Sequence, residues 1–224
     1  RRIFGGNRWR KTKMILFCGD PHAHFDYIIE RVQANRPKAV ILLGDQCFMS
    51  PFDEIFKSVS DTPIYFIQGN HDTDQVIYYD HLAAAEAHNI NCQIVDIGGL
   101  RVAGLGGIFR GQIWYPPEAP RYQSRADFIA RCGKGNRWRG GLPLKHRSSI
   151  FPEDFELFKG QKADILVCHE APAAHPHGFA AIDELADLLG VKQIIHGHHH
   201  NPFIYAEPRY VNVGFRGFYE VDTP

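Results

Sequence analysis

Short apolar runs alternate along the chain with longer stretches of helix-like spacing. Gly, Pro or polar residues bound the apolar runs, which cover residues 14–17, 39–43, 63–67, 93–97, 100–103, 164–168 and 192–195. Runs this short favour strands over helices. The stretches with helix-like spacing lie at about 25–35, 52–59, 73–88, 152–159 and 179–189. The alternation predicts βαβ units and an α/β fold with a largely parallel sheet buried on both faces.

Five of the predicted strands are followed by side chains of the kinds that bind metals. These segments are Gly19-Asp20-Pro21-His22, Gly44-Asp45, Gly69-Asn70-His71-Asp72, His169 and His196-Gly197-His198-His199-His200. In open α/β sheets, ligands bind beyond the carboxyl ends of the strands, so we expect the five segments to converge. Each segment alone has a simpler explanation as a turn, a helix cap or a core histidine. Together they predict one shared site, because buried charges need partners.

Composition sets the class of protein. The 224 residues are 44% hydrophobic and 22% charged, which suits one large α/β domain and disfavours disordered, collagen-like and coiled-coil chains. No apolar run approaches the ~18 residues of a membrane span, so we expect no membrane partner. The five cysteines are odd in number and contain no C-x-x-C pair, which is typical of reduced thiols. We therefore expect a cytoplasmic location.

Charge is balanced overall but unevenly distributed. Residues 1–13 hold six basic and no acidic side chains, and Met14 then opens the first strand-like run. We expect residues 1–13 to be a basic extension outside a domain that spans 14–224. Residues 108–150 hold nine basic and two acidic side chains and interrupt the strand rhythm, which predicts an inserted cap.

Aromatic side chains are interleaved with the basic residues of this insertion. They are Trp114, Tyr115, Tyr122, Phe128 and Trp138. Such a mixture can bind phosphates and stack on the bases of a nucleotide or a single-stranded nucleic acid. Alternatively, the arginines pair with the acidic body and the aromatic residues form a small satellite core. The sequence leaves both interpretations open.

In this order, the five segments resemble the signature of the calcineurin-like metallophosphoesterases, which is D-x-H, G-D, G-N-H-[DE], H and G-H-x-H. The resemblance spans residues 20 to 200 and implies a four-layer αββα sandwich with a two-metal centre at one end. It implies a first metal held by Asp20, His22, Asp45 and His200. It implies a second metal held by Asp45, Asn70, His169 and His198, with Asp45 as the bridging carboxylate. Mixed imidazole and carboxylate ligands suit divalent transition metals, with Mn expected and Fe, Zn, Co or Ni as alternatives.

The resemblance also implies a chemistry. A hydroxide that bridges the two metals would attack the phosphoester, and His71 would act as general acid, with Asp72 as a further catalytic residue beside it. Protein Ser/Thr phosphatases carry G-D-x-x-D-R-G in the second segment, whereas this chain has Phe48 in place of the second Asp and lacks the Arg. We therefore expect a phosphodiester, nucleotide or nucleic-acid substrate. A phosphorylated small molecule or a phosphoprotein is the enzymatic alternative, and a protein-binding scaffold is the non-enzymatic one.

Six further residues are candidates for substrate contacts. His24, His175 and His177 lie near the ligand segments, and Arg110, Arg137 and Arg139 belong to the basic insertion. The competing interpretation of the three histidines is that they are polar loop residues facing solvent.

Overall fold

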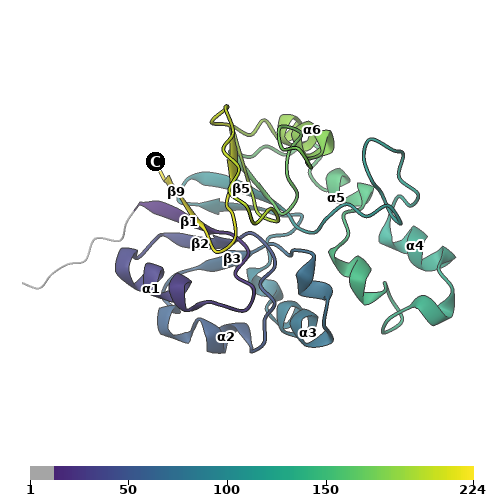
Figure 1. Cartoon of the computed structure of the whole chain (residues 1–224), viewed down its shortest axis with the longest axis horizontal. Coiled ribbons are helices and arrows are strands. Elements are labelled where there is room, and N and C mark those ends of the chain that lie inside the picture. Colours follow the sequence, from purple (N-terminus) through teal and green to yellow (C-terminus); the bar gives the residue numbers. More distant parts are fainter. Residues whose placement is uncertain (1–12) are drawn as a thin grey trace, which may run out of the picture.

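The computed structural model describes residues 13–224 and contains two β-sheets with helices on their outer faces (Figure 1). The strand orders are β3-β2-β1-β9 and β4-β5-β6-β7-β8. All pairs are parallel except β1 with β9 and β4 with β5. The strands are β1 Met14–Cys18, β2 Ala39–Leu42, β3 Ile64–Phe66, β4 Ile94–Ile97, β5 Leu100–Leu105, β6 Ile165–Cys168, β7 Gln193–His196, β8 Tyr210–Asn212 and β9 Phe218–Asp222.

Three apolar layers hold the sandwich together. The central layer joins the inner faces of both sheets and includes Ile15 and Phe17 of β1 together with Val167 of β6. On the outer face of the first sheet, Leu16 packs in a layer with Ile28 of helix α1 (Asp26–Asn35). A third layer lies between the second sheet and helix α6 (Ala180–Leu189). Successive residues of β1 thus serve opposite layers, which explains why the central strands read as continuous apolar runs.

The helices predicted at 25–35 and 179–189 form to within one residue, whereas those predicted at 52–59, 73–88 and 152–159 are shorter or interrupted. The α-helices are α1 Asp26–Asn35, α2 Phe52–Ile55, α3 Val76–Ala84, α4 Arg125–Arg131, α5 Pro152–Glu156 and α6 Ala180–Leu189. The 3-10 helices are η1 Lys57–Val59, η2 His71–Thr73, η3 Glu86–His88, η4 Lys134–Asn136 and η5 Leu144–Ser148. None of the helices in the described part of the chain has the length and apolar composition that a membrane crossing requires.

The four-layer α/β sandwich is confirmed, with two differences in detail. The structure has two mixed sheets where the apolar pattern alone predicts one largely parallel sheet. It also adds β8 and β9, which no apolar run indicates. Residues of β9 alternate between exposed and half-buried positions, so an edge strand of this kind has no continuous apolar signal.

The insertion forms a lobe beside the sandwich, at the right of Figure 1. It contains α4, η4 and η5 and has a small apolar cluster of its own around Ile113, Phe128 and Leu142. Arg139 Nη1 donates to Asp80 Oδ1 of α3 at 2.5 Å, and Arg147 Nη1 donates to Tyr79 Oη at 2.7 Å. Two of the nine basic side chains of the insertion thus attach the lobe to α3 of the sandwich. Apart from Lys13, the predicted N-terminal extension lies outside the described residues.

Phe48, which stands where protein phosphatases have an aspartate, points into the core. Its side chain is fully buried, with ring centroids 5.5 Å from Phe25, 5.9 Å from Phe52 and 5.8 Å from Phe66. We expect Phe48→Ala to lower the free energy of unfolding by about 3–5 kcal/mol, because truncation leaves a cavity among these rings. Urea denaturation measures the loss, and Met49→Ala, whose side chain is 57% exposed, is the control. Equal stability of the two variants would contradict this packing.

Candidate metal centre

Histidine and aspartate side chains from both sheets meet at the carboxyl ends of the strands. Two sets of donor atoms each lie within 4.8 Å of one another. The first set comprises His22, Asp45 and His200, and the second comprises Asp45, His169 and His198. Asp45 therefore belongs to both sets, as a bridging carboxylate would.

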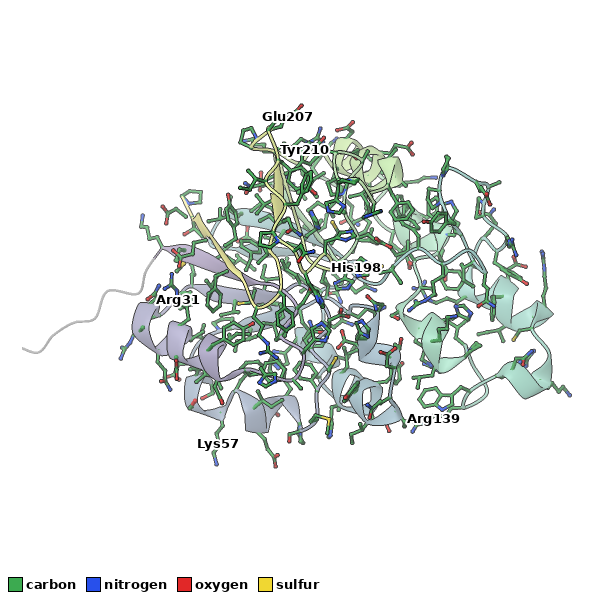
Figure 2. The ribbon with its side chains drawn as sticks, viewed as in Figure 1. Arg31, Lys57, Arg139, His198, Glu207 and Tyr210 are labelled. Carbon is green, nitrogen blue, oxygen red and sulfur yellow. The ribbon has the colours of Figure 1, made fainter. Side chains whose placement is uncertain are left out.

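The other two candidate ligands adjoin one set each. Asp20 Oδ2 lies 3.8 Å from His200 Nε2, and Asn70 Oδ1 lies 3.1 Å from His169 Nε2. Between the two sets, Asp45 Oδ2 lies 3.7 Å from His22 Nε2 and 3.4 Å from His169 Nε2. The structure thus brings together all seven side chains that the resemblance implies as metal ligands. Figure 2 shows one of them, His198, near the middle of the molecule.

The backbone is locally strained to achieve this convergence. Asp20, His22, Asp45 and His198 all have positive φ, between 31° and 67°, a region that non-glycine residues rarely occupy. Glycines next to the ligands permit close packing. A Cβ on Gly44 would lie 2.2 Å from His169 Nδ1, and a Cβ on Gly69 would lie 2.2 Å from Asp45 Oδ1.

Two buried oxygens show that these residues fit a metal ion. Asp20 Oδ2 and Asp45 Oδ2 are buried and have no hydrogen-bond partner. The other oxygen of each carboxylate accepts a hydrogen bond. His198 N donates to Asp20 Oδ1 at 3.2 Å, and His71 N donates to Asp45 Oδ1 at 2.8 Å. A buried carboxylate oxygen without a partner is costly, and a bound cation removes that cost.

Electrostatics in the cluster favour positive charge between the carboxylates. Burial opposes the charged form of His169, but the charges of Asp45 and Asp20 outweigh it and raise the pKa of His169 to about 10. Burial raises the pKa of Asp20 to about 6 and lowers the pKa of His198 to about 3. His169 Nδ1 donates to Leu43 O at 2.7 Å, which directs Nε2 toward Asp45 and Asn70. Such a bond fixes the ring orientation that a metal ligand requires.

His71 lies at the rim of the cluster, with its ring centroid 5.3 Å from that of His22. Its Nδ1 donates to Asp74 Oδ2 at 2.6 Å. Asp72 has a different environment, because its buried carboxylate accepts the backbone N–H of Cys47 at 2.7 Å and of Gly69 at 2.8 Å. The partner of His71 is therefore Asp74, whose only signal in the sequence is its position three residues along the same turn.

The six candidate substrate contacts have different surroundings. Arg110 is half-buried, and the charges of Glu170, Asp74 and Asp45 act on it, although burial lowers its pKa overall. Its Nη1 donates to Ser148 O at 2.8 Å and to Ser149 Oγ at 3.1 Å. Arg137 Nη2 donates to Ile129 O at 2.6 Å within the lobe, and Arg139 pairs with Asp80 far from the cluster in Figure 2. Of the three arginines, Arg110 has the closest electrostatic connection to the cluster.

The three candidate histidines also differ in their exposure and in their contacts. His24 is exposed, and it belongs to neither of the donor sets found among the described residues. His175 is buried and stacks on His199 with ring centroids 3.9 Å apart. His177 lies farther out, 6.0 Å from His199.

One aromatic side chain at the cluster has no signal in the sequence. Phe215 follows β8, is 42% exposed, and has its ring centroid 5.6 Å from His22 and 4.9 Å from His200. Its contacts arise from the return of the chain after β8, which the apolar pattern does not reveal.

Comparisons with known proteins agree with this architecture. The calcineurin-like phosphoesterase family matches residues 13–202. An uncharacterized protein from Haemophilus influenzae is 43% identical over 214 residues, covering 93% of this chain and 94% of that protein. The crystal structure of TT1561 from Thermus thermophilus shares the fold, with a TM-score of 0.56, 15% identity, and coverage of 95% of this chain and all of that one. The chain belongs to the calcineurin-like phosphoesterase family, whose members are metal-dependent, and its clustered histidine and aspartate side chains fit a metal site.

Proposed function

We propose that the protein hydrolyses a phosphodiester, of the class found in nucleotides or nucleic acids, with two divalent metal ions. The observation that supports this most directly is the pair of donor sets that share Asp45, with His71 beside them. Two ions held there would activate water and neutralise phosphoryl charge. Manganese is the ion we expect, since the mixed nitrogen and oxygen donors suit divalent transition metals.

The residues of the chain have separate tasks in this reaction. Asp45 Oδ1 accepts the His71 N–H and so holds the His71 backbone against the ligand cluster. Asp74 accepts from Nδ1 of His71, which leaves Nε2 free to donate a proton. Water gives up a proton to solvent and adds to phosphorus as hydroxide while the bond from phosphorus to the leaving oxygen breaks. That oxygen takes the proton from His71 Nε2, and a proton from solvent then restores His71.

Arg110 is our candidate for holding a phosphoryl oxygen. Within the described residues, Nη1 is the guanidinium nitrogen of Arg110 that makes hydrogen bonds, so its other N–H donors are available for a substrate. Its Nη1 donates to Ser148 Oγ at 3.2 Å, and Ser148 Oγ lies 2.7 Å from Thr73 Oγ1, two residues after His71, which supports a position near the reacting group.

Two alternatives have less support. A phosphoprotein phosphatase of the G-D-x-x-D-R-G type needs an aspartate where Phe48 packs in the core. A non-catalytic scaffold needs none of the strained, glycine-flanked donors that the chain retains.

The test compares two chromogenic esters after chelation and reconstitution with Mn²⁺. Bis-p-nitrophenyl phosphate is a diester, p-nitrophenyl phosphate is a monoester, and both release p-nitrophenol. We expect kcat/KM for the diester to exceed that for the monoester by at least about tenfold, and chelation to remove the activity. A monoester preference would contradict the proposed substrate class. Absence of turnover with Mn²⁺, Zn²⁺, Co²⁺ and Ni²⁺ would contradict the proposed reaction.

A further inference from the structure

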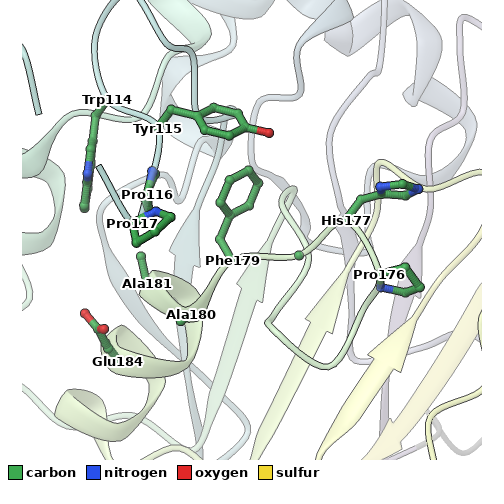
Figure 3. Close-up of a pocket in the computed structure, with 11 residues that line it drawn as sticks. Trp114, Tyr115, Pro116, Pro117, Pro176, His177, Phe179, Ala180, Ala181 and Glu184 are labelled. Carbon is green, nitrogen blue, oxygen red and sulfur yellow. The ribbon is translucent and has the colours of Figure 1, made fainter. Parts of the chain in front are cut away.

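An aromatic hollow of about 490 Å³ opens between the insertion and α6 (Figure 3). Residues 114–117 form one wall, residues 176–181 form the other, and Glu184 lies at one end. Figure 3 shows Tyr115 and Phe179 close together in the middle of the hollow, with His177 toward the other end. The volume lies within the range of small-molecule sites.

Two independent connections tie this hollow to the metal centre. On one side, Trp114 N donates to Arg110 O at 2.9 Å, so this wall begins one tight turn after Arg110. On the other side, the His177 ring lies 6.0 Å from His199, and His199 lies 4.9 Å from the ligand His198. The two walls of the hollow thus arise from the two segments that flank the cluster.

The lining has the chemistry of a site for a planar ring. Tyr115 is 51% exposed and meets Phe179 edge to face, with centroids 5.1 Å apart. Phe179 is supported from behind by Phe109, 4.7 Å away. The lining, all of which falls within the described residues, contains no Lys or Arg, and its one carboxylate, Glu184, would repel a phosphate. The group held here is therefore uncharged, and the phosphate remains at the metal centre.

We propose that this hollow is the subsite for a nucleobase of the substrate, with Tyr115 as its main stacking residue. The inference rests on the proposed phosphodiesterase function and adds to it the part of the substrate that confers specificity. Aromatic faces stack on any base, so the subsite selects nucleosides over small alkyl groups with little preference among bases.

The test uses two esters that release p-nitrophenol and differ in the group that stays on phosphorus. One is the p-nitrophenyl ester of thymidine 5′-phosphate, and the other is methyl p-nitrophenyl phosphate. The readout is kcat/KM for the thymidine ester divided by kcat/KM for the methyl ester, both measured with Mn²⁺. We expect Tyr115→Ala to lower this ratio about tenfold, because one stacking contact is lost. Tyr115→Phe keeps the ring and should stay within about twofold of wild type. Leu157→Ala, at a 56% exposed position that is not part of the lining, is the matched control and should also stay within about twofold of wild type.

The outcomes separate this inference from the proposed function. If wild type hydrolyses both esters and Tyr115→Ala leaves the ratio unchanged, the subsite is wrong and the phosphodiesterase function stands. If wild type hydrolyses neither ester, the proposed function fails, and binding of thymidine, which carries no phosphate, then decides the subsite by titration calorimetry. Binding that Tyr115→Ala weakens would support the subsite, whereas no binding, or equal binding by both proteins, would overturn it.

Discussion

Asp45→Ala is expected to lose both metal ions and to reduce kcat/KM by at least about a thousandfold. The reason is geometric, because Asp45 is the only residue common to the two donor sets found among the described residues. Its Oδ2 lies within 3.7 Å of His22 and 3.4 Å of His169. Metal content after dialysis, measured by mass spectrometry, should fall from two ions per chain to none as activity disappears.

Asp74→Asn is the matched control for this experiment. Asp74 is an exposed carboxylate that contacts His71 and belongs to neither donor set. It should retain two ions per chain. Two ions retained at wild-type affinity in Asp45→Ala would refute the bridging role, and loss of a single ion would assign Asp45 to one set only.

His71→Ala should keep both ions and lose kcat by about 10²–10⁴-fold on substrates with poor leaving groups. The loss should be much smaller for p-nitrophenyl esters, because p-nitrophenolate leaves without needing a proton. Comparing a nucleoside diester with its p-nitrophenyl analogue measures this difference. An equal loss on both substrates would show that His71 does not donate the proton.

Asp74→Asn should reproduce part of the His71 effect. Because Asp74 Oδ2 accepts from His71 Nδ1 at 2.6 Å, its replacement should lower kcat about tenfold on poor leaving groups and leave KM unchanged. A change in KM alone would assign Asp74 to substrate binding instead.

The sequence predicts the central strands well because they are buried on both faces. Leu16 and Phe17 of β1 pack in different apolar layers. The strand is therefore a continuous apolar run without a polar residue, which is easily identified in the sequence. The apolar pattern does not reveal that the strands divide into two sheets, because each strand looks alike whichever partner it pairs with. That division comes from the family resemblance.

At the site, the convergence of glycine-flanked candidate ligands at strand ends is predictable, and the contacts made by their neighbours are not. Asp20 and Asp45 follow apolar runs that mark their positions. Asp74 gains its role from a contact within one turn, and Phe215 from a contact with a distant segment. The basic insertion shows the same limit. Charge alone could not distinguish Arg139, which pairs with Asp80, from Arg110, which lies in the field of the cluster.

Each donor set draws on both sheets, and this has a thermodynamic consequence. His22 and Asp45 follow strands of the first sheet, whereas His169, His198 and His200 follow strands of the second. A bound ion is therefore a cross-link between the two halves of the sandwich, and neither sheet can separate from the other without releasing it. A ligand that binds only the assembled state adds about 2.7 kcal/mol of stability at a free concentration one hundred times its Kd. The metal supply would then govern the lifetime of the folded protein as well as its turnover.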